Sequence, residues 1–384
     1  MSHADRLNAN QDVAASFLNG EVTSTGATTI VCDWIPPEFG AVGQYMHVRS
    51  LQLASQGRDV ALVGLGRQKA EVDHTHIGQG HLSIVRIDAR SSATPKTGLL
   101  TRGLWAMRMN VRLIMATHRA LKGRGQGDLV VTGSPPFLSS LMIMINALLW
   151  RQHLIYRITD FYPETILASG QASWIRFLAP VFKAIRARAD QFEVLGRDQE
   201  RRLMEDGFAA SRITLVRDGS PVKFDPGMQP LESPFEPQAR ILLYSGNLGV
   251  AHPIDVFCEA YRRHIQSGSN RVRLWVNGIG ARVKDVVAFC RKHDLPLHVS
   301  GPVDLDRLGR LLITADAHLI LLGDAYWGYV LPSKIYACLE SGKPILFVGP
   351  PESDVALLMR EADDRRHLQT TDIESCFQFL ENLS

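Results

Sequence analysis

The sequence predicts an α/β protein built from two doubly wound parallel-sheet domains. Short apolar runs, typical of buried strands, alternate with longer segments, typical of helices, over most of the chain. With 384 residues, the chain is longer than one ordinary α/β core requires. Residues 223–238 hold four prolines and show no apolar periodicity, which is typical of a linker. We therefore expect domains at 28–222 and 239–384 that face each other across a cleft.

The composition excludes several classes of protein. Hydrophobic residues make up 45% of the chain and charged residues 21%, which is ordinary for a globular protein. The net charge is only +3, so the whole-chain balance implies little about partners, and no nucleic-acid partner is expected. The five cysteines are scattered without metal-ligand spacing, which favours a reduced, cytoplasmic protein. Residues 1–27 are polar, and we expect a disordered segment rather than a signal peptide. The longest apolar run, Leu141–Trp150, is far shorter than the ~20 residues of a membrane-spanning helix.

The first domain begins with a predicted βαβ unit. A strand at Thr28–Trp34 runs into a glycine-containing turn, and a helix to about Gln56 leads to a second strand at Val60–Leu65. Further apolar runs predict the other strands of this domain: Leu82–Ile87, Asp128–Thr132, Leu154–Ile158, Phe192–Leu195 and Ile213–Val216.

The second domain repeats the alternation after the proline-rich stretch. A last helix is expected at about Ile373 to Leu383. The predicted strands are Ile241–Tyr244, Val272–Val276, Leu297–Val299, His318–Leu322 and Ile345–Val348.

Residues 316–349 predict strand, loop, helix and strand in that order. Pro332 stands where a first helical residue would be, Ser333 and Lys334 open the helix, and Gly342 ends it. Ligands of parallel sheets bind where strands end, and a helix N-terminus there suits a phosphate. Lys334 would add a full positive charge. The alternative is that this tripeptide is only a well-formed helix start.

Glycine-rich loops follow several of the predicted strands. Glycine lets the backbone approach a ligand closely, so these loops suggest a nucleotide-diphosphate site, although glycine after a strand is often only a turn. No P-loop motif and no opening dinucleotide fingerprint occurs in the chain. The candidate donor-binding residues in these loops are Gly40, Gly43, Gly246, Asn247, Gly249, Gly278 and Gly280.

One segment of the first domain differs in charge from the rest. Residues 96–124 contain seven lysines and arginines and no acidic residue, with apolar side chains interleaved. A second basic patch lies at 176–188. Basic amphipathic helices suit a membrane surface with anionic lipid, whereas the alternative is two core-packed helices with solvated faces. The candidate membrane or acceptor contacts are Trp105, Arg108, Arg112 and Arg119.

Several motifs are spread over about residues 28–350. They are Pro36-Pro-Glu-Phe-Gly-Ala-Val-Gly43, Asp160-Phe-Tyr-Pro-Glu164, Tyr244-Ser-Gly-Asn-Leu-Gly249, Val276-Asn-Gly-Ile-Gly280, Pro332-Ser-Lys334 and Glu340-Ser-Gly-Lys-Pro344. Together these motifs resemble one known family, the GT-B glycosyltransferases of the large retaining group called family 4. The likeness is greatest to the branch that builds bacterial surface polysaccharides.

The resemblance implies two Rossmann-like domains and a nucleotide-diphosphate sugar as donor. It implies a polyprenyl-diphosphate-linked or oligosaccharide acceptor, at the cytoplasmic face of the inner membrane. It also implies retention of anomeric configuration, with no cofactor and no metal ion. Lys334 and Ser333 would then stabilise the leaving diphosphate, and Glu340 is a candidate ribose contact.

For the acceptor, the sequence offers two carboxylates near the end of a predicted strand. We expect Asp160 to act as a base or to orient the acceptor, with Glu164 as second choice. The alternative for Asp160 is a helix N-cap. His47 and His252 are weaker candidates, and His74 and His76 lack a nearby third metal ligand in the sequence.

The chain departs from the family pattern at three places. Ala337 and Tyr329 stand where the family usually has glutamates, and Thr132-Gly-Ser-Pro-Pro136 stands where many members have a histidine. Two alternative functions therefore stay open. One is a non-catalytic GT-B partner or nucleotide-sugar-binding subunit, and the other is a nucleotide-sugar epimerase.

Overall fold

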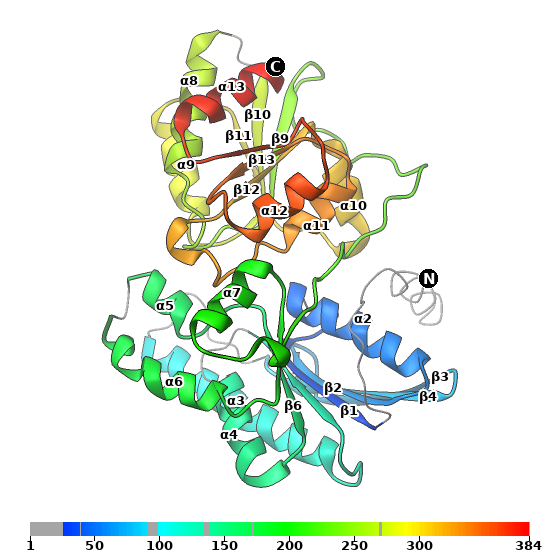
Figure 1. The fold of residues 1–384 in the computed structure, drawn as a ribbon. Coiled ribbons are helices and arrows are strands. Elements are labelled where there is room, and N and C mark those ends of the chain that lie inside the picture. Colours follow the sequence, from blue (N-terminus) through cyan, green and yellow to red (C-terminus); the bar gives the residue numbers. More distant parts are fainter. Residues whose placement is uncertain are drawn as a thin grey trace. The chain divides into compact units, whose positions relative to one another are not determined.

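A computed structural model describes residues 26–38, 40–90, 99–133, 138–170, 173–268 and 271–383 (Figure 1). The chain forms two compact units that divide between Asp218 and Gly219. Most of the predicted disordered segment, residues 1–25, lies outside the described residues. No helix in the described ranges is both long enough and apolar enough to cross a bilayer.

The N-terminal unit contains an eight-stranded sheet in the order β3-β4-β2-β1-β5-β6-β7-β8. Its neighbouring strands run parallel, except for the antiparallel pair β3 and β4. The strands are β1 (Thr28–Trp34), β2 (Asp59–Gly66), β3 (Glu71–Ile77), β4 (Gly80–Asp88), β5 (Asp128–Val131), β6 (His153–Ile158), β7 (Gln191–Val194) and β8 (Ile213–Leu215).

The seven strands predicted for this unit are present, and β3 is the one that was missed. Its sequence is mostly polar, and Val72 is 53% exposed, so no apolar run marks it. β3 lies at the edge of the sheet and pairs with β4, and most of its side chains are at least partly exposed to solvent. Such a strand does not need a continuous apolar run.

Helices cover both faces of this sheet. Tyr156 in β6 hydrogen-bonds with Ser139 in α4. The next residue, Arg157, binds Glu193, which also binds Arg49 in α2. Successive strand residues point to opposite faces, so α2 and α4 lie on opposite sides of the sheet. The helices are α2 (Ala41–Ser55), α3 (Leu99–Leu121), α4 (Leu138–Ile145), η1 (Asn146–Trp150), α5 (Glu164–Ala168), η2 (Ser173–Leu178), α6 (Ala179–Arg186), α7 (Arg197–Glu205) and η3 (Ala210–Arg212).

The C-terminal unit contains a six-stranded parallel sheet in the order β11-β10-β9-β12-β13-β14. The five predicted strands are present, and the three-residue β14 was missed. The strands are β9 (Arg240–Asn247), β10 (Val272–Ile279), β11 (Leu297–Ser300), β12 (Ala317–Leu321), β13 (Ile345–Val348) and β14 (Leu368–Thr370). The helices are α8 (Asp255–Ser267), α9 (Val283–Lys292), α10 (Leu305–Thr314), η4 (Asp324–Tyr326), α11 (Lys334–Glu340), α12 (Asp354–Glu361) and α13 (Ile373–Leu383).

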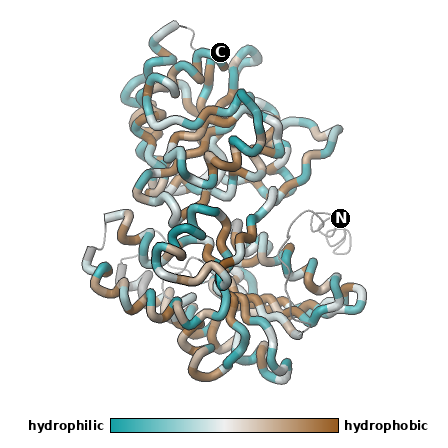
Figure 2. Tube along the Cα trace, in the orientation of Figure 1, coloured by the Kyte–Doolittle hydropathy of each residue, from teal (hydrophilic) through white to brown (hydrophobic). Residues whose placement is uncertain are grey.

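Two hydrophobic cores lie on the two faces of this second sheet. Leu242 packs in one core with Phe257 of α8, and the adjacent Leu243 packs in the other with Leu311 of α10. This alternation is that of a doubly wound sheet, as predicted. Figure 2 shows hydrophobic residues along the strands of each unit, with hydrophilic positions interspersed along the outer helices.

The proline-rich stretch at 223–238 differs from the predicted free linker. Phe224, Leu231 and Phe235 pack against the core that contains Trp275. The backbone N–H of Leu231 donates to the Thr314 hydroxyl over 2.8 Å. The stretch therefore belongs to the C-terminal unit, and the division between the units comes earlier in the chain.

The helix predicted after Pro332 is α11, and it has only seven residues. It begins at Lys334, with Ser333 as the N-cap residue, so it starts slightly later than the sequence indicates. Gly342 ends it at φ 65°, a left-handed conformation that glycine adopts without strain.

Candidate active site

Lys334 lies beside the end of β9, with its amine against an aromatic ring. Its Nζ is 3.4 Å from the centroid of Tyr244, and a Cβ added to Gly246 would lie 3.7 Å from Nζ. The residue as a whole is only partly buried, but Nζ is shielded from solvent and has no hydrogen-bond partner among the described residues. A buried donor without an acceptor is costly, which is why such groups often mark ligand sites.

The loop after β9 fixes the ring beneath this lysine. The hydroxyl of Tyr244 donates to the carbonyl of Asn247 over 2.9 Å. His252 stands edge-on to the ring, with centroids 6.2 Å apart and an interplanar angle of 80°. The imidazole Nδ1 of His252 accepts the N–H of Gly249 over 3.1 Å. The ring contact with His252 and the hydrogen bond to the Asn247 carbonyl therefore both fix the position of Tyr244.

Burial sets the charges in this part of the site. It lowers the pKa of Lys334 to about 7, and the nearby Cys338 acts weakly in the opposite direction. Burial, with the charge of Lys334, lowers the pKa of His252 to about 3. Burial raises the pKa of the Cys338 thiol to about 12. His252 and Cys338 are therefore neutral near pH 7 and give Lys334 no counter-charge.

The predicted glycine positions divide into two kinds. Gly246 lies next to Lys334, as described. A Cβ on Gly278 would lie 1.9 Å from the Gly246 carbonyl oxygen, and one on Gly280 would lie 2.2 Å from the Leu248 oxygen. These two glycines let the loops after β9 and β10 approach each other, which explains them without a ligand. Gly249 also differs from expectation, since its N–H already donates to His252.

Other predicted donor-side residues lie at different distances from Lys334. Asn247 is exposed beside Gly246, and Ser333 precedes Lys334 without a capping side-chain bond. Glu340 is at the other end of α11, roughly 9 Å away along the helix. Its carboxyl hydrogen-bonds with Ser220, and burial raises its pKa. Ala337, at one of the positions where the resemblance implies a glutamate, is buried in the hydrophobic core.

In the N-terminal unit, Asp160 follows β6 at the carboxyl edge of the sheet. Burial, reinforced by the negative charge of Asp33 at the end of β1, raises the pKa of Asp160 to about 6. A Cβ on Gly133, after the intervening β5, would lie 3.6 Å from the Asp33 carboxyl carbon. Two carboxylates thus lie at one edge of the sheet, and the raised pKa of Asp160 is typical of a group that can act as an acid or a base.

Glu164, the second predicted base, is engaged in an ion pair. Both its carboxylate oxygens lie 2.9 Å from Nη2 of Arg186. The same nitrogen donates to the Tyr162 carbonyl, and the guanidinium stacks on Phe161. Arg186 is almost fully buried, so Glu164 balances its charge and holds this loop to α6. The structure thus gives Glu164 a structural role.

The predicted residues around α2 have mixed roles. A Cβ on Gly43 would lie 1.7 Å from the Trp34 carbonyl oxygen, so only glycine allows the helix to pack here. Gly40 has more space, with its nearest neighbour 3.8 Å away. Burial, with the nearby charge of Arg86, lowers the pKa of His47 to about 4 and leaves it neutral.

Helix α3 carries the predicted membrane contacts, but not all on its exposed side. Trp105 is partly buried and stacks on Trp34, with centroids 6.2 Å apart. Arg112 donates to the Asp88 carbonyl over 2.7 Å. Arg108 and Arg119 are exposed. The large apolar residues exposed on the described helices of this unit are Leu104, Met107, Val111, Met115, Leu141, Met144, Leu148, Leu149, Trp174, Phe177, Leu178, Val181 and Met204.

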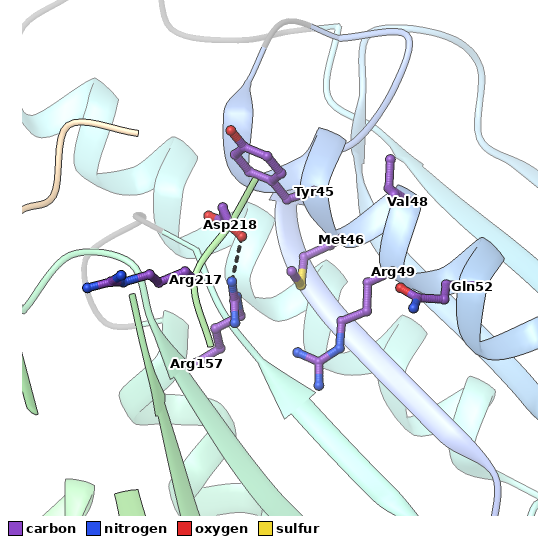
Figure 3. A pocket seen from close by; sticks show the side chains of 8 residues that line it. All are labelled: Tyr45, Met46, Val48, Arg49, Gln52, Arg157, Arg217 and Asp218. Atoms are coloured by element: carbon purple, nitrogen blue, oxygen red, sulfur yellow. Dashed lines mark hydrogen bonds and ion pairs between the residues drawn. The ribbon is translucent and has the colours of Figure 1, made fainter. Parts of the chain in front are cut away.

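A buried ion cluster connects α2 to the sheet of the N-terminal unit, and Figure 3 draws three of its residues, Arg49, Arg157 and Asp218. Arg49 binds Glu193 through both nitrogens at 2.5 and 2.6 Å. Arg157 bridges Glu193 and Asp218 at 3.1 and 2.5 Å. The cavity beside this cluster has a volume of about 20 Å³, which suits a water molecule and excludes a sugar.

The described residues hold no group of three or more His, Cys, Asp or Glu side chains arranged to bind a metal ion. His74 and His76 do gain a neighbour, since the ring of His81 lies 5.4 and 5.1 Å from theirs. Nδ1 of His74 pairs with Ser83, and that of His81 pairs with Asp59.

Comparisons with known proteins agree on the architecture. The solved structure of WaaG, a glycosyltransferase involved in lipopolysaccharide biosynthesis, superposes with a TM-score of 0.59 and 14% identity, covering 92% of this chain and 90% of that one. Sucrose-phosphate synthase from Thermosynechococcus elongatus superposes with a TM-score of 0.60 and 13% identity, covering 93% of this chain and 92% of that one. Anabaena HepE, solved with UDP and glucose, superposes with a TM-score of 0.55 and 11% identity, covering 92% of this chain and 89% of that one.

The chain has the GT-B glycosyltransferase fold. A curated relative, the probable glycosyltransferase WbjE of Pseudomonas aeruginosa, is 26% identical in an alignment of 287 residues that covers 69% of this chain and 68% of that protein. No family model matches the sequence. Together the relative and the fold support a glycosyltransferase.

Sequence reasoning did not consider Asp33 of the N-terminal unit, and it gave Tyr244 and His252 of the C-terminal unit no supporting role. Asp33 closes an apolar strand, and a carboxylate at such a strand end was a usable signal. Tyr244 was quoted within a motif but given no role, since its contact with Lys334 joins positions far apart in the sequence. His252 was considered only as a ligand contact, whereas it supports Tyr244 and the Gly249 backbone.

Proposed function

We propose that this protein transfers a sugar, with retention, from a nucleotide-diphosphate sugar to a polyprenyl-diphosphate-linked or oligosaccharide acceptor. The pathway would be bacterial surface polysaccharide synthesis, and the family 4 type is proposed from the sequence motifs. The observation that carries the proposal is the buried Nζ of Lys334, which lies without a hydrogen-bond partner among the described residues at the end of β9. HepE, which shares the fold, was solved with UDP and glucose.

In this reaction the bond between the sugar's anomeric carbon and the diphosphate oxygen breaks. A bond forms between that carbon and an acceptor oxygen on the same face of the sugar, and the acceptor proton passes to the released diphosphate. Negative charge grows on the leaving diphosphate as the bond stretches. Lys334 supplies positive charge there, which stabilises the transition state more than the ground state.

Asp160 is our candidate for orienting the acceptor hydroxyl. Its carboxylate form accepts a hydrogen bond from that hydroxyl and holds the oxygen toward the anomeric carbon. Asp33 acts on it through charge and raises its pKa. No covalent intermediate with the protein is required, because the donor phosphate itself takes the proton.

We place the protein on the cytoplasmic face of the inner membrane, where a lipid-linked acceptor is reached. The support comes from α3, whose exposed side carries Leu104, Met107 and Val111 beside Arg108 and Arg119. Apolar side chains flanked by cations match the headgroup region of an anionic bilayer.

A non-catalytic GT-B subunit is the second candidate function. The observation that favours it is Ala337, which is buried in the hydrophobic core at a position where the family has a glutamate. An epimerase has no comparable support.

Mass spectrometry with a panel of nucleotide sugars and a lipid-diphosphate acceptor tests the proposal. A transferase forms glycosylated lipid and slowly releases free sugar from the donor. An epimerase converts the donor sugar, and a non-catalytic subunit does neither. Unchanged donors and acceptor over the whole panel would contradict transferase activity.

A further inference from the structure

Among the residues that the structure describes, the amine of Lys334 faces no anionic group. Tyr244 of β9 presents its ring, His252 presents a neutral imidazole from the loop after β9, and Cys338 of α11 presents a neutral thiol. The phenol of Tyr244 is committed to the Asn247 carbonyl and burial raises its pKa, so it offers no negative charge.

Two effects act on the charge of such an amine. Loss of water disfavours the ammonium form, and an aromatic face at 3.4 Å favours it. Desolvation dominates and brings the pKa of Lys334 to about 7. A diphosphate beside Nζ would add negative charge and hydrogen-bond acceptors, both of which favour the ammonium form.

Building on the function proposed above, we propose that Tyr244 and His252 are positioning residues that hold Lys334 as an unpaired amine, and that the donor's diphosphate binds together with one proton taken up by that amine. The proton comes from solvent and ends on Nζ. His252 contributes by supporting the Tyr244 ring while bringing no negative charge that would occupy Lys334 in the donor's place.

The proposal predicts a defined pH dependence. Below pH 6, Lys334 is already charged and binding takes up little proton. At pH 8, an amine that titrates at about 7 is ~10% protonated, so binding takes up ~0.9 proton per site. Nucleotide affinity then falls up to ~10-fold per pH unit above 7, as expected for linked protonation.

The first measurement is the titration of Lys334 in the free protein by NMR. Full-length protein is labelled with [ε-13C]lysine, and the Lys334 signal is identified by its loss in Lys334→Arg. A midpoint near 7 is expected. A midpoint near 10 would overturn the proposal, whether or not the protein is a transferase.

The second measurement is calorimetric titration with UDP, GDP, dTDP and ADP at pH 8 and pH 6, in buffers of different ionisation enthalpy. Proton uptake at pH 8 that vanishes at pH 6 and in Lys334→Met is expected. Binding without proton uptake contradicts the inference while leaving the proposed function intact. If no nucleotide binds, the proposed function fails. The NMR titration then still decides whether the free protein holds Lys334 as an amine with a midpoint near 7.

Substitutions at the positioning residues separate positioning from packing. Tyr244→Leu removes the ring that favours the ammonium form, so the Lys334 midpoint should fall, whereas Tyr244→Phe should keep it. If Tyr244 only kept water out, Tyr244→Leu would instead raise the midpoint toward ~10.4. His252→Asp places a carboxylate beside Lys334 and should raise the midpoint, abolish proton uptake and weaken nucleotide binding. An unchanged midpoint in both Tyr244→Leu and His252→Asp would refute the positioning roles.

Discussion

The substitution Lys334→Met should raise the stability of the protein and lower its rate of sugar transfer. Methionine keeps the length and apolar stem of lysine but removes the buried nitrogen. Nζ has no hydrogen-bond partner among the described residues, and leaving such a group unsatisfied costs about 1–3 kcal/mol. The variant should therefore be more stable than the native protein by about that amount. For a unit of the size of Gly219–Ser384, each kcal/mol shifts the unfolding temperature by ~2–4 °C.

The stability gain of Lys334→Met should depend on pH in a predictable direction. The folded state holds Lys334 with a pKa of about 7, and the unfolded chain at ~10.4. Between these values the unfolded state binds more protons, so the native protein gains stability as pH rises. The advantage of the variant is thus largest below pH 7, and it shrinks by up to ~1.4 kcal/mol per pH unit above that.

The same substitution should reduce sugar transfer by ~100- to 1000-fold, the effect of losing one stabilising group at a developing charge. Transfer is measured with a nucleotide sugar and a lipid-diphosphate acceptor, and stability by thermal unfolding at pH 6 and pH 9. Lys343→Met, beyond the end of α11, is the matched control and should change neither quantity by much. Wild-type transfer by Lys334→Met, or a loss of stability at pH 6, would refute the assignment.

Three further predictions concern the N-terminal unit. Asp160→Asn should abolish the acid limb of kcat/KM near pH 6, and Asp33→Asn should move that limb to lower pH, because the charge that raises the pKa of Asp160 is gone; pH–rate profiles check both. Glu164→Gln should cost about 1–3 kcal/mol of stability and leave kcat within a few fold, as denaturant unfolding and a transfer assay would show. Replacing Arg108 and Arg119 by Glu should release the protein from anionic vesicles in a flotation assay; equal binding of the native protein to neutral vesicles would contradict the electrostatic part of this proposal.

The strands could be predicted because each carries its own apolar run. The runs at residues 28–34 and 241–244 are buried in the structure, and their parallel order follows from the helices between them. The strand at 71–77 could not be found this way, since it is a polar edge strand. Its position depends on the pairing with β4, which is a tertiary property.

The site was predictable in type but not in detail. Gly246 and Gly278 are equivalent as sequence signals, because each follows an apolar strand. The structure places one beside Lys334 and the other against the Gly246 backbone. A glycine after a strand therefore indicates that the backbone approaches another group closely, but the sequence does not show whether that group is a ligand or another part of the chain. The ion pair of Glu164 could not be predicted for a similar reason, because its partner Arg186 comes from another helix.

Lys334 shows where sequence evidence stops and tertiary evidence begins. A Pro-Ser-Lys tripeptide is equally compatible with a helix start and with a phosphate site. The distinction comes from Tyr244, which belongs to β9 and stacks under Nζ only because α11 packs beside that strand. A lysine that merely opened a helix would extend into water at no cost. This amine is instead buried without a hydrogen-bond acceptor among the described residues, and that cost makes sense when a ligand provides the acceptor.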